Sequence, residues 1–138
     1  MSTKNKTISL NLFSGETILQ GMPELAYVFN KEGQLLSWNK NTEKVLGYSK
    51  KELYLKNVSD FQEINDRERV HKVFTDVLLN GEEKSVEYNM LTKSGQKIPC
   101  LGTGSLAIVD GKEYLIGIAI NVSKLKNVEK NLQSNLLR

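Results

Sequence analysis

The sequence contains little of what usually marks a covalent, metal-binding or membrane function. Its single cysteine, Cys100, cannot form an internal disulfide, which fits a reducing compartment. No run approaches the roughly 18 apolar residues that a membrane-spanning helix needs, and the start of the chain lacks the long apolar segment of a secretory signal. We therefore expect a soluble, cytoplasmic module that makes no direct contact with a membrane.

Blocks of like charge are also absent. The net charge is +3, charged residues make up 25% of the chain, and the lysines are spread along it. A nucleic-acid-binding surface usually needs clustered basic residues. The charge pattern therefore argues against a nucleic-acid partner and favours an ordinary solvated surface.

The residues of a catalytic centre are missing as well. There is no spacing typical of metal ligands, and the only histidine, His71, has no nucleophile beside it in the sequence. The segment Gly102-Thr103-Gly104 lacks the strand-to-helix context of a phosphate-binding loop, and its glycines more simply leave room inside the fold. We expect that this chain is not an enzyme and binds no metal, whatever the parent protein catalyses.

The chain does contain enough apolar residues for one core. With 138 residues, of which 39% are hydrophobic, it fits a single domain. Its clearest pattern lies between Phe61 and Gly81, where apolar residues recur at the spacing of one helix face: Val70, Val73, Phe74, Val77 and Leu78. We expect Asn65 to cap this helix, with Glu68 three residues later, and Gly81 to end it.

Alternating apolar residues predict strands on both sides of that helix. The expected strands are 25–30 and 34–38 before it, and 86–91, 97–109 and 113–122 after it. Short helices are expected after Asn39 and Ser49, and the dipeptide Asp110-Gly111 predicts a tight hairpin turn. We divide the chain into a flexible arm at 1–12, a capping helix at 13–22, a domain at 23–122 and a basic helix at 123–138.

Four local motifs, in this order, resemble those of PAS domains. Trp38-Asn39, followed by Leu46-Gly47-Tyr48-Ser49 and Glu52-Leu53, is similar to the family's Asn…Leu-x-Gly-Tyr-Ser-x-x-Glu-Leu stretch. Asp66-Arg67-Glu68-Arg69-Val70 resembles the start of its long helix. Lys93-Ser94-Gly95 resembles its Lys-Asp-Gly turn, and Asn121-Val122-Ser123 stands where its Asp-Ile-Thr motif is found. The resemblance covers about residues 17–126, and Asn121 lacks the charge that the family's Asp carries.

This resemblance implies an α+β fold. The PAS fold has a five-stranded antiparallel sheet of order 2-1-5-4-3, with short helices and one long helix packed on one face. It also implies a sensory module of a signal-transduction protein, typically a two-component sensor histidine kinase or a related regulator that supplies the output domain. Such a module either senses a small molecule or works without a ligand, by dimerisation and relay of a signal through the C-terminal helix.

A ligand would lie between the long helix and the sheet. Strand alternation and helical phase give the candidate lining: Tyr27, Phe29, Phe61, Val70, Val73, Phe74, Val77, Val86, Tyr88, Met90, Ile98, Cys100 and Leu115. A domain of this size needs about this many large side chains for its core alone. Tyr27 and Tyr88 stand out, because a buried hydroxyl needs a hydrogen-bonding partner.

The identity of any cofactor stays open, but two are disfavoured. Haem needs an axial ligand, and His71 is rotated about 100° from its apolar neighbour Val70, toward the flank of the helix. A flavin photosensor of the LOV type would need a cysteine within residues 57–62, which read NVSDFQ. Cys100 is expected to be a small buried apolar residue on a strand.

The last strand is apolar on both faces, which predicts a covered outer surface. Its outward residues, together with two residues of the capping helix, form the candidate dimer interface: Phe13, Ile18, Ile116, Ile118 and Ile120. We expect a homodimer, or the capping helix, to cover them. In the C-terminal helix, Leu125, Val128 and Leu132 are spaced as in a short coiled coil or an ordinary amphipathic tail.

Overall fold

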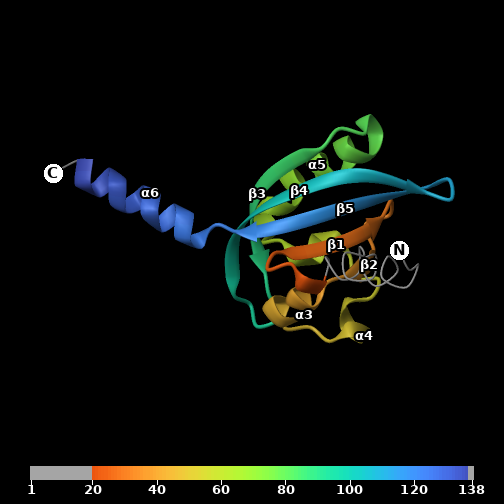
Figure 1. Ribbon diagram of the computed structural model, residues 1–138, viewed down its shortest axis with the longest axis horizontal. Coiled ribbons are helices and arrows are strands. Elements are labelled where there is room, and N and C mark those ends of the chain that lie inside the picture. The colour runs from red at the N-terminus through yellow and green to blue at the C-terminus, as the bar shows by residue number, and fades with distance from the viewer. Residues whose placement is uncertain (1–19, 137–138) are drawn as a thin grey trace, which may run out of the picture.

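The computed structural model describes residues 20–136. The predicted arm at 1–12 and most of the predicted capping helix, including Phe13 and Ile18, lie outside the described residues. The rest forms an α+β fold around one antiparallel sheet in the order β2-β1-β5-β4-β3, as predicted (Figure 1). The strands are β1 (Leu25–Asn30), β2 (Leu35–Trp38), β3 (Lys84–Leu91), β4 (Lys97–Val109) and β5 (Lys112–Asn121).

Helices cover one face of this sheet. The helical segments are α3 (Lys40–Leu46), α4 (Lys50–Leu53), the 3-10 turns Val58–Phe61 and Ile64–Asp66, α5 (Arg67–Asn80) and α6 (Ser123–Leu136). Helix α5 packs against β3, β4 and β5, whereas α6 extends away from the domain (Figure 1). The buried core, which includes Leu53, Val77 and Ala119, therefore lies between the sheet and the helical layer.

The long helix begins later than the sequence predicts. Asn65 does not cap it; α5 starts at Arg67, and Phe61 belongs to a separate 3-10 turn. The carboxylate of Asp66 instead accepts hydrogen bonds from the backbone N–H of Asn89, at 2.8 Å, and from Arg69, at 3.1 Å. The bond from Asn89 joins the start of the helix to β3. The predicted capping box would have bonded only within the first turn of the helix. The predicted end is confirmed, because Gly81 adopts φ +71° and its N–H bonds to the carbonyl of Val77.

Asn39 joins the first strand to the first helix. Its side chain, 0% exposed, caps α3 by accepting from the N–H and the hydroxyl of Thr42, at 3.2 and 2.6 Å. The same oxygen accepts from the N–H of Ala26, and the amide nitrogen donates to the carbonyl of Glu24 at 2.8 Å. One buried carboxamide therefore joins the start of β1 to the start of α3. The predicted capping box of α4, between Ser49 and Glu52, is also present.

Candidate functional site

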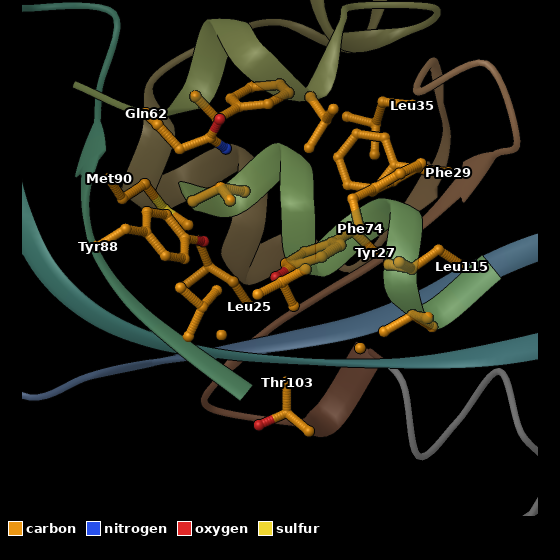
Figure 2. A pocket seen from close by; sticks show the side chains of 18 of the residues that line it. Leu25, Tyr27, Phe29, Leu35, Gln62, Phe74, Tyr88, Met90, Thr103 and Leu115 are labelled. Carbon is orange, nitrogen blue, oxygen red and sulfur yellow. The ribbon is translucent and has the colours of Figure 1, made fainter. Parts of the chain in front are cut away.

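A cavity of about 70 Å³ lies between α5 and the inner face of the sheet (Figure 2). Most of the predicted lining residues surround it: Tyr27, Phe29, Phe61, Val70, Val73, Phe74, Val77, Val86, Tyr88, Met90 and Leu115. Helical phase and strand alternation thus identify side chains that meet at one space. That a ligand binds there stays a prediction.

Ile98 and Cys100 are buried but do not line the cavity. They point inward, as expected, opposite Met90 and Tyr88 in the β3–β4 register. The part of β4 that lines the cavity lies further along the strand, at Gly102, Thr103 and Gly104. The expected burial of these two residues is present, but they lie outside the cavity lining, and a contact with a ligand stays a prediction.

Several lining residues were not predicted: Leu25, Leu35, Thr42, Leu46, Val58, Gln62, Lys84 and Thr103. Leu25 shares strand parity with Tyr27 and Phe29, so the alternation already contained a signal for it. Thr103 contributes its backbone, since its side chain points away from the cavity (Figure 2) and bonds to the hydroxyl of Ser85 at 2.8 Å. No sequence pattern indicates that Gln62 lines the cavity, because it is a polar residue that follows a 3-10 turn.

Aromatic rings form the apolar end of the cavity. The ring of Phe29 meets those of Tyr27, Phe61 and Phe74 edge to face, with centroid distances of 5.4, 6.4 and 6.1 Å. Such pairs are worth about 0.5–1.5 kcal/mol beyond the area that they bury. The cluster therefore gives the cavity a rigid wall that joins β1, the first 3-10 turn and α5.

Two glycines allow the tyrosine rings to lie against the sheet. A Cβ on Gly117, the β5 partner of Tyr27, would overlap the Tyr27 ring. A Cβ on Gly102 would stand 2.9 Å from Cε1 of Tyr88 and 3.6 Å from the hydroxyl oxygens of both tyrosines. The bare backbone of Gly102 thus brings the two hydroxyls together at the cavity.

Burial keeps these hydroxyls protonated. It raises the pKa of Tyr27 to about 12, an effect that a hydrogen bond with Tyr88 partly offsets. Burial also raises the pKa of Tyr88 well above its usual value, and the nearby Tyr27 adds to the shift. The pKa of the Cys100 thiol rises to about 11, again through burial, so the cysteine is a poor nucleophile. The site therefore offers neutral hydrogen-bonding groups and no activated thiolate.

Raising the pH above 10 is expected to destabilise the fold through Tyr27. The unfolded chain ionises this residue near pH 10 and the folded chain near pH 12, so the unfolded state loses the proton first. Between these values the free energy of unfolding should fall by up to about 1.4 kcal/mol per pH unit for this one group. Urea unfolding across this range should show a shallower fall in Tyr27→Phe than in wild type, and the exposed control Tyr54→Phe should behave like wild type. Equal slopes in wild type and Tyr27→Phe would contradict the assignment.

The site does not fit haem or a LOV-type flavin. His71 is exposed and does not line the cavity, where α5 presents Val70 instead. The cavity volume of about 70 Å³ is far below the roughly 300–1,000 Å³ typical of cofactor and drug-sized ligand sites. Within the described residues, no group of three acidic, cysteine or histidine side chains could hold a metal ion. Between residues 20 and 136, no helix is long and apolar enough to cross a membrane.

A family model described as the PAS fold matches residues 14–122. The chain belongs to the PAS family. The resemblance of the four motifs is thereby confirmed, as is the order of the sheet. A comparison with curated protein sequences finds no significant match.

Solved PAS domains share this fold. The PAS domain of an HTR-like protein from Haloarcula marismortui is 16% identical with a TM-score of 0.71, covering 86% of this chain and 97% of that one. A domain of a sensory box sensor histidine kinase/response regulator from Geobacter sulfurreducens is 16% identical, with a TM-score of 0.68 and coverages of 87% and 100%. The PAS domain of nitrogen regulation protein NR(II) from Vibrio parahaemolyticus is 13% identical, with a TM-score of 0.66 and coverages of 78% and 97%.

Proposed function

We propose that this PAS domain senses a small molecule, which it holds in the cavity between α5 and the sheet. The observation that carries the proposal is the cavity itself, which is lined on β4 by the bare backbone of Gly102 and Gly104. Closely packed cores contain few spaces larger than a water molecule, and an apolar pocket with a few polar groups is where a small-molecule ligand usually binds. The similar domain from a sensory box sensor histidine kinase/response regulator supports a role as the input module of such a kinase or a related regulator. In this role the chain is cytoplasmic and not itself an enzyme.

Strand β5 offers a route from the cavity to the C-terminal helix. Leu115 of β5 lines the cavity, and the strand continues into α6 two residues after Asn121. The side chain of Asn121 accepts from the N–H of Ser123 at 2.8 Å, which caps the first turn of α6 without the charge of the family's Asp. A ligand that moves β5 would therefore reorient α6 through this short, hydrogen-bonded junction.

Native mass spectrometry of gently purified protein, together with thermal shift across a metabolite panel, tests the proposal. A ligand of the folded state must raise its stability by mass action. We expect a retained adduct, or a rise in melting temperature for a narrow set of small molecules. Protein that carries no adduct and is stabilised by no member of the panel would contradict ligand sensing.

Gly102→Ala is expected to abolish that stabilisation, because its methyl group would enter the cavity 2.9 Å from the Tyr88 ring. Gly21→Ala is the control away from the cavity. A Cβ there would meet nothing within 4 Å, and Gly21 does not line the cavity. The thermal shift with a panel ligand should vanish in the first variant and persist in the second. An unchanged shift in Gly102→Ala would place the ligand elsewhere.

Exposed apolar residues favour a second function, dimerisation without a ligand. On the outer face of β5, Ile116 is 47% and Ile120 is 40% exposed, with the half-buried Ile118 between them. Along α6, Leu125, Val128 and Leu132 are also exposed at a 3-4 spacing. A second copy of the chain that covers both surfaces would remove this apolar area from water.

Ile118→Glu is expected to convert a dimer into a monomer, because it places a charge at the centre of this apolar face. Light scattering over a range of protein concentrations measures the mass. Ile64→Glu, at an exposed position of the second 3-10 turn, is the control and should leave the mass unchanged. A dimer that survives Ile118→Glu would count against this interface.

A further inference from the structure

Gln62 has a buried side chain without a hydrogen bond. Four polar side chains are buried in the described part of the chain: Asn39, Thr42, Gln62 and Thr92. Asn39 and Thr42 bond to backbone and to each other, and Thr92 bonds to Ser94 and to the N–H of Gln96. The carboxamide of Gln62 makes no bond to the protein and points into the cavity, although the residue is only 3% exposed (Figure 2). Its amide atoms are not fully shielded from solvent, so water or a ligand that enters the cavity can bond to them.

The backbone of Gln62 is held in place, so its side chain is presented to the cavity. Its N–H bonds to the carbonyl of Ser59 at 3.5 Å, and the residue pairs with Met90 in an isolated bridge to β3. Tyr88 lies two residues before Met90, on the same inward side of that strand. The carboxamide therefore enters the same cavity as the hydroxyls of Tyr27 and Tyr88 (Figure 2).

The cavity contains no free charge. Lys84 is the one charged residue among its described lining, and its ammonium is 3.1 Å from the carboxylate of Asp76 on α5. The two tyrosines keep their protons across the physiological range, since burial raises the pKa of both. A buried ion without a counter-charge is strongly disfavoured. Carboxylates, phosphates and ammonium ions are therefore poor occupants.

The volume limits the size of the occupant. A cavity of about 70 Å³ is less than half of the roughly 150 Å³ that holds one benzene. It suits a molecule of about three or four non-hydrogen atoms.

We infer that the cavity selects an uncharged molecule of this size, whose carboxamide or hydroxyl group bonds to Gln62 and whose apolar part faces the aromatic wall. This inference rests on the proposed function and names the chemical class that the sensor takes. Gln62 supplies both an acceptor and two donors. The two tyrosine hydroxyls bond to each other, so together they leave one O–H donor and acceptor lone pairs for a ligand. A ligand group that both donates and accepts hydrogen bonds therefore fits these side chains best. An ion or a purely apolar molecule would leave the Gln62 carboxamide without all of its hydrogen bonds.

Three probes of nearly identical shape test the inference: acetamide, acetate and 2-methylpropene. Titrations followed by ¹H–¹⁵N correlation spectra would report on the Gln62 side-chain amide and on the backbone of Gly102 and Gly104. We expect saturable shifts at these positions with acetamide, and binding at least about tenfold weaker with acetate at matched ionic strength. Equal binding of acetate, or acetamide shifts outside the cavity only, would overturn the inference.

Gln62→Leu gives the sharper comparison. It removes no hydrogen bond within the chain, so we expect a folded protein with an unchanged or higher melting temperature. Acetamide should bind at least about tenfold more weakly to it, and 2-methylpropene should bind more tightly. Gln96→Leu, the same substitution at an exposed turn residue, should behave like wild type. Undiminished acetamide binding in Gln62→Leu would overturn the role of Gln62.

The two proposals fail in different ways. If 2-methylpropene enters the wild-type cavity and acetamide does not, the cavity accepts ligands and the inferred ligand class is wrong. If no probe gives a saturable shift, in wild type or in Gln62→Leu, the space holds only water or is closed. That outcome would contradict the inference and the proposed sensing function together.

Discussion

Asn39→Ala is expected to lower the free energy of unfolding by about 3–4 kcal/mol. The substitution removes the side-chain cap of α3, worth about 0.5–2 kcal/mol. It also leaves the N–H of Ala26 and the carbonyl of Glu24 without their partner, and each unsatisfied buried group costs about 1–3 kcal/mol. The loss is large because one side chain serves two elements that are far apart in the chain.

Urea unfolding of Asn39→Ala beside Asn57→Ala separates this role from ordinary capping. Asn57 caps the first 3-10 turn through an exposed bond to the N–H of Ser59 at 3.0 Å. Its loss should cost no more than about 1 kcal/mol. Equal effects of the two substitutions would show that Asn39 is only a helix cap.

Gly117→Ala is expected to lower the free energy of unfolding by about 2–3 kcal/mol, because its methyl group would overlap the Tyr27 ring. That ring cannot easily move, since it packs on Phe29 at a centroid distance of 5.4 Å and its hydroxyl bonds to Tyr88. Gly21→Ala is the control, as a Cβ there would meet nothing within 4 Å. Chemical unfolding should show the difference.

A double-mutant cycle with Tyr27→Leu identifies the cause. Once the ring is gone, Gly117→Ala should cost less than about 1 kcal/mol, giving a coupling energy typical of residues in contact. If Gly117→Ala costs the same with and without the ring, backbone entropy or flexibility, rather than the ring, explains the glycine.

The strands could be predicted well because apolar and polar residues alternate along them, and this alternation follows from which side chains are buried. The long strand β4 and the turn at Asp110-Gly111 follow from alternation and turn chemistry alone, and both turn residues adopt positive φ, 52° and 76°. The order of the sheet required the resemblance to PAS domains, since alternation does not say which strands are neighbours. The inward positions of the cavity lining then follow from strand parity and helical phase.

The errors arose where contacts distant in the chain decide the outcome. The start of α5 depends on the bond from Asp66 to the N–H of Asn89, which a local motif around Asn65 cannot reveal. Ile98 and Cys100 have the right parity, but the β4 residues that line the cavity lie further along the strand, at Gly102 and Gly104. The place of Gln62 in the cavity lining could not be predicted, because a polar residue after a short turn is usually on the surface.

A crystal structure under xenon pressure would show whether the cavity exists, because xenon enters only space that is present inside the fold. We expect a xenon atom between α5 and the sheet, beside Gly102, and none at that place in Gly102→Ala. Wild-type crystals in which Phe74 and Tyr88 close over this space, with no xenon bound, would contradict it.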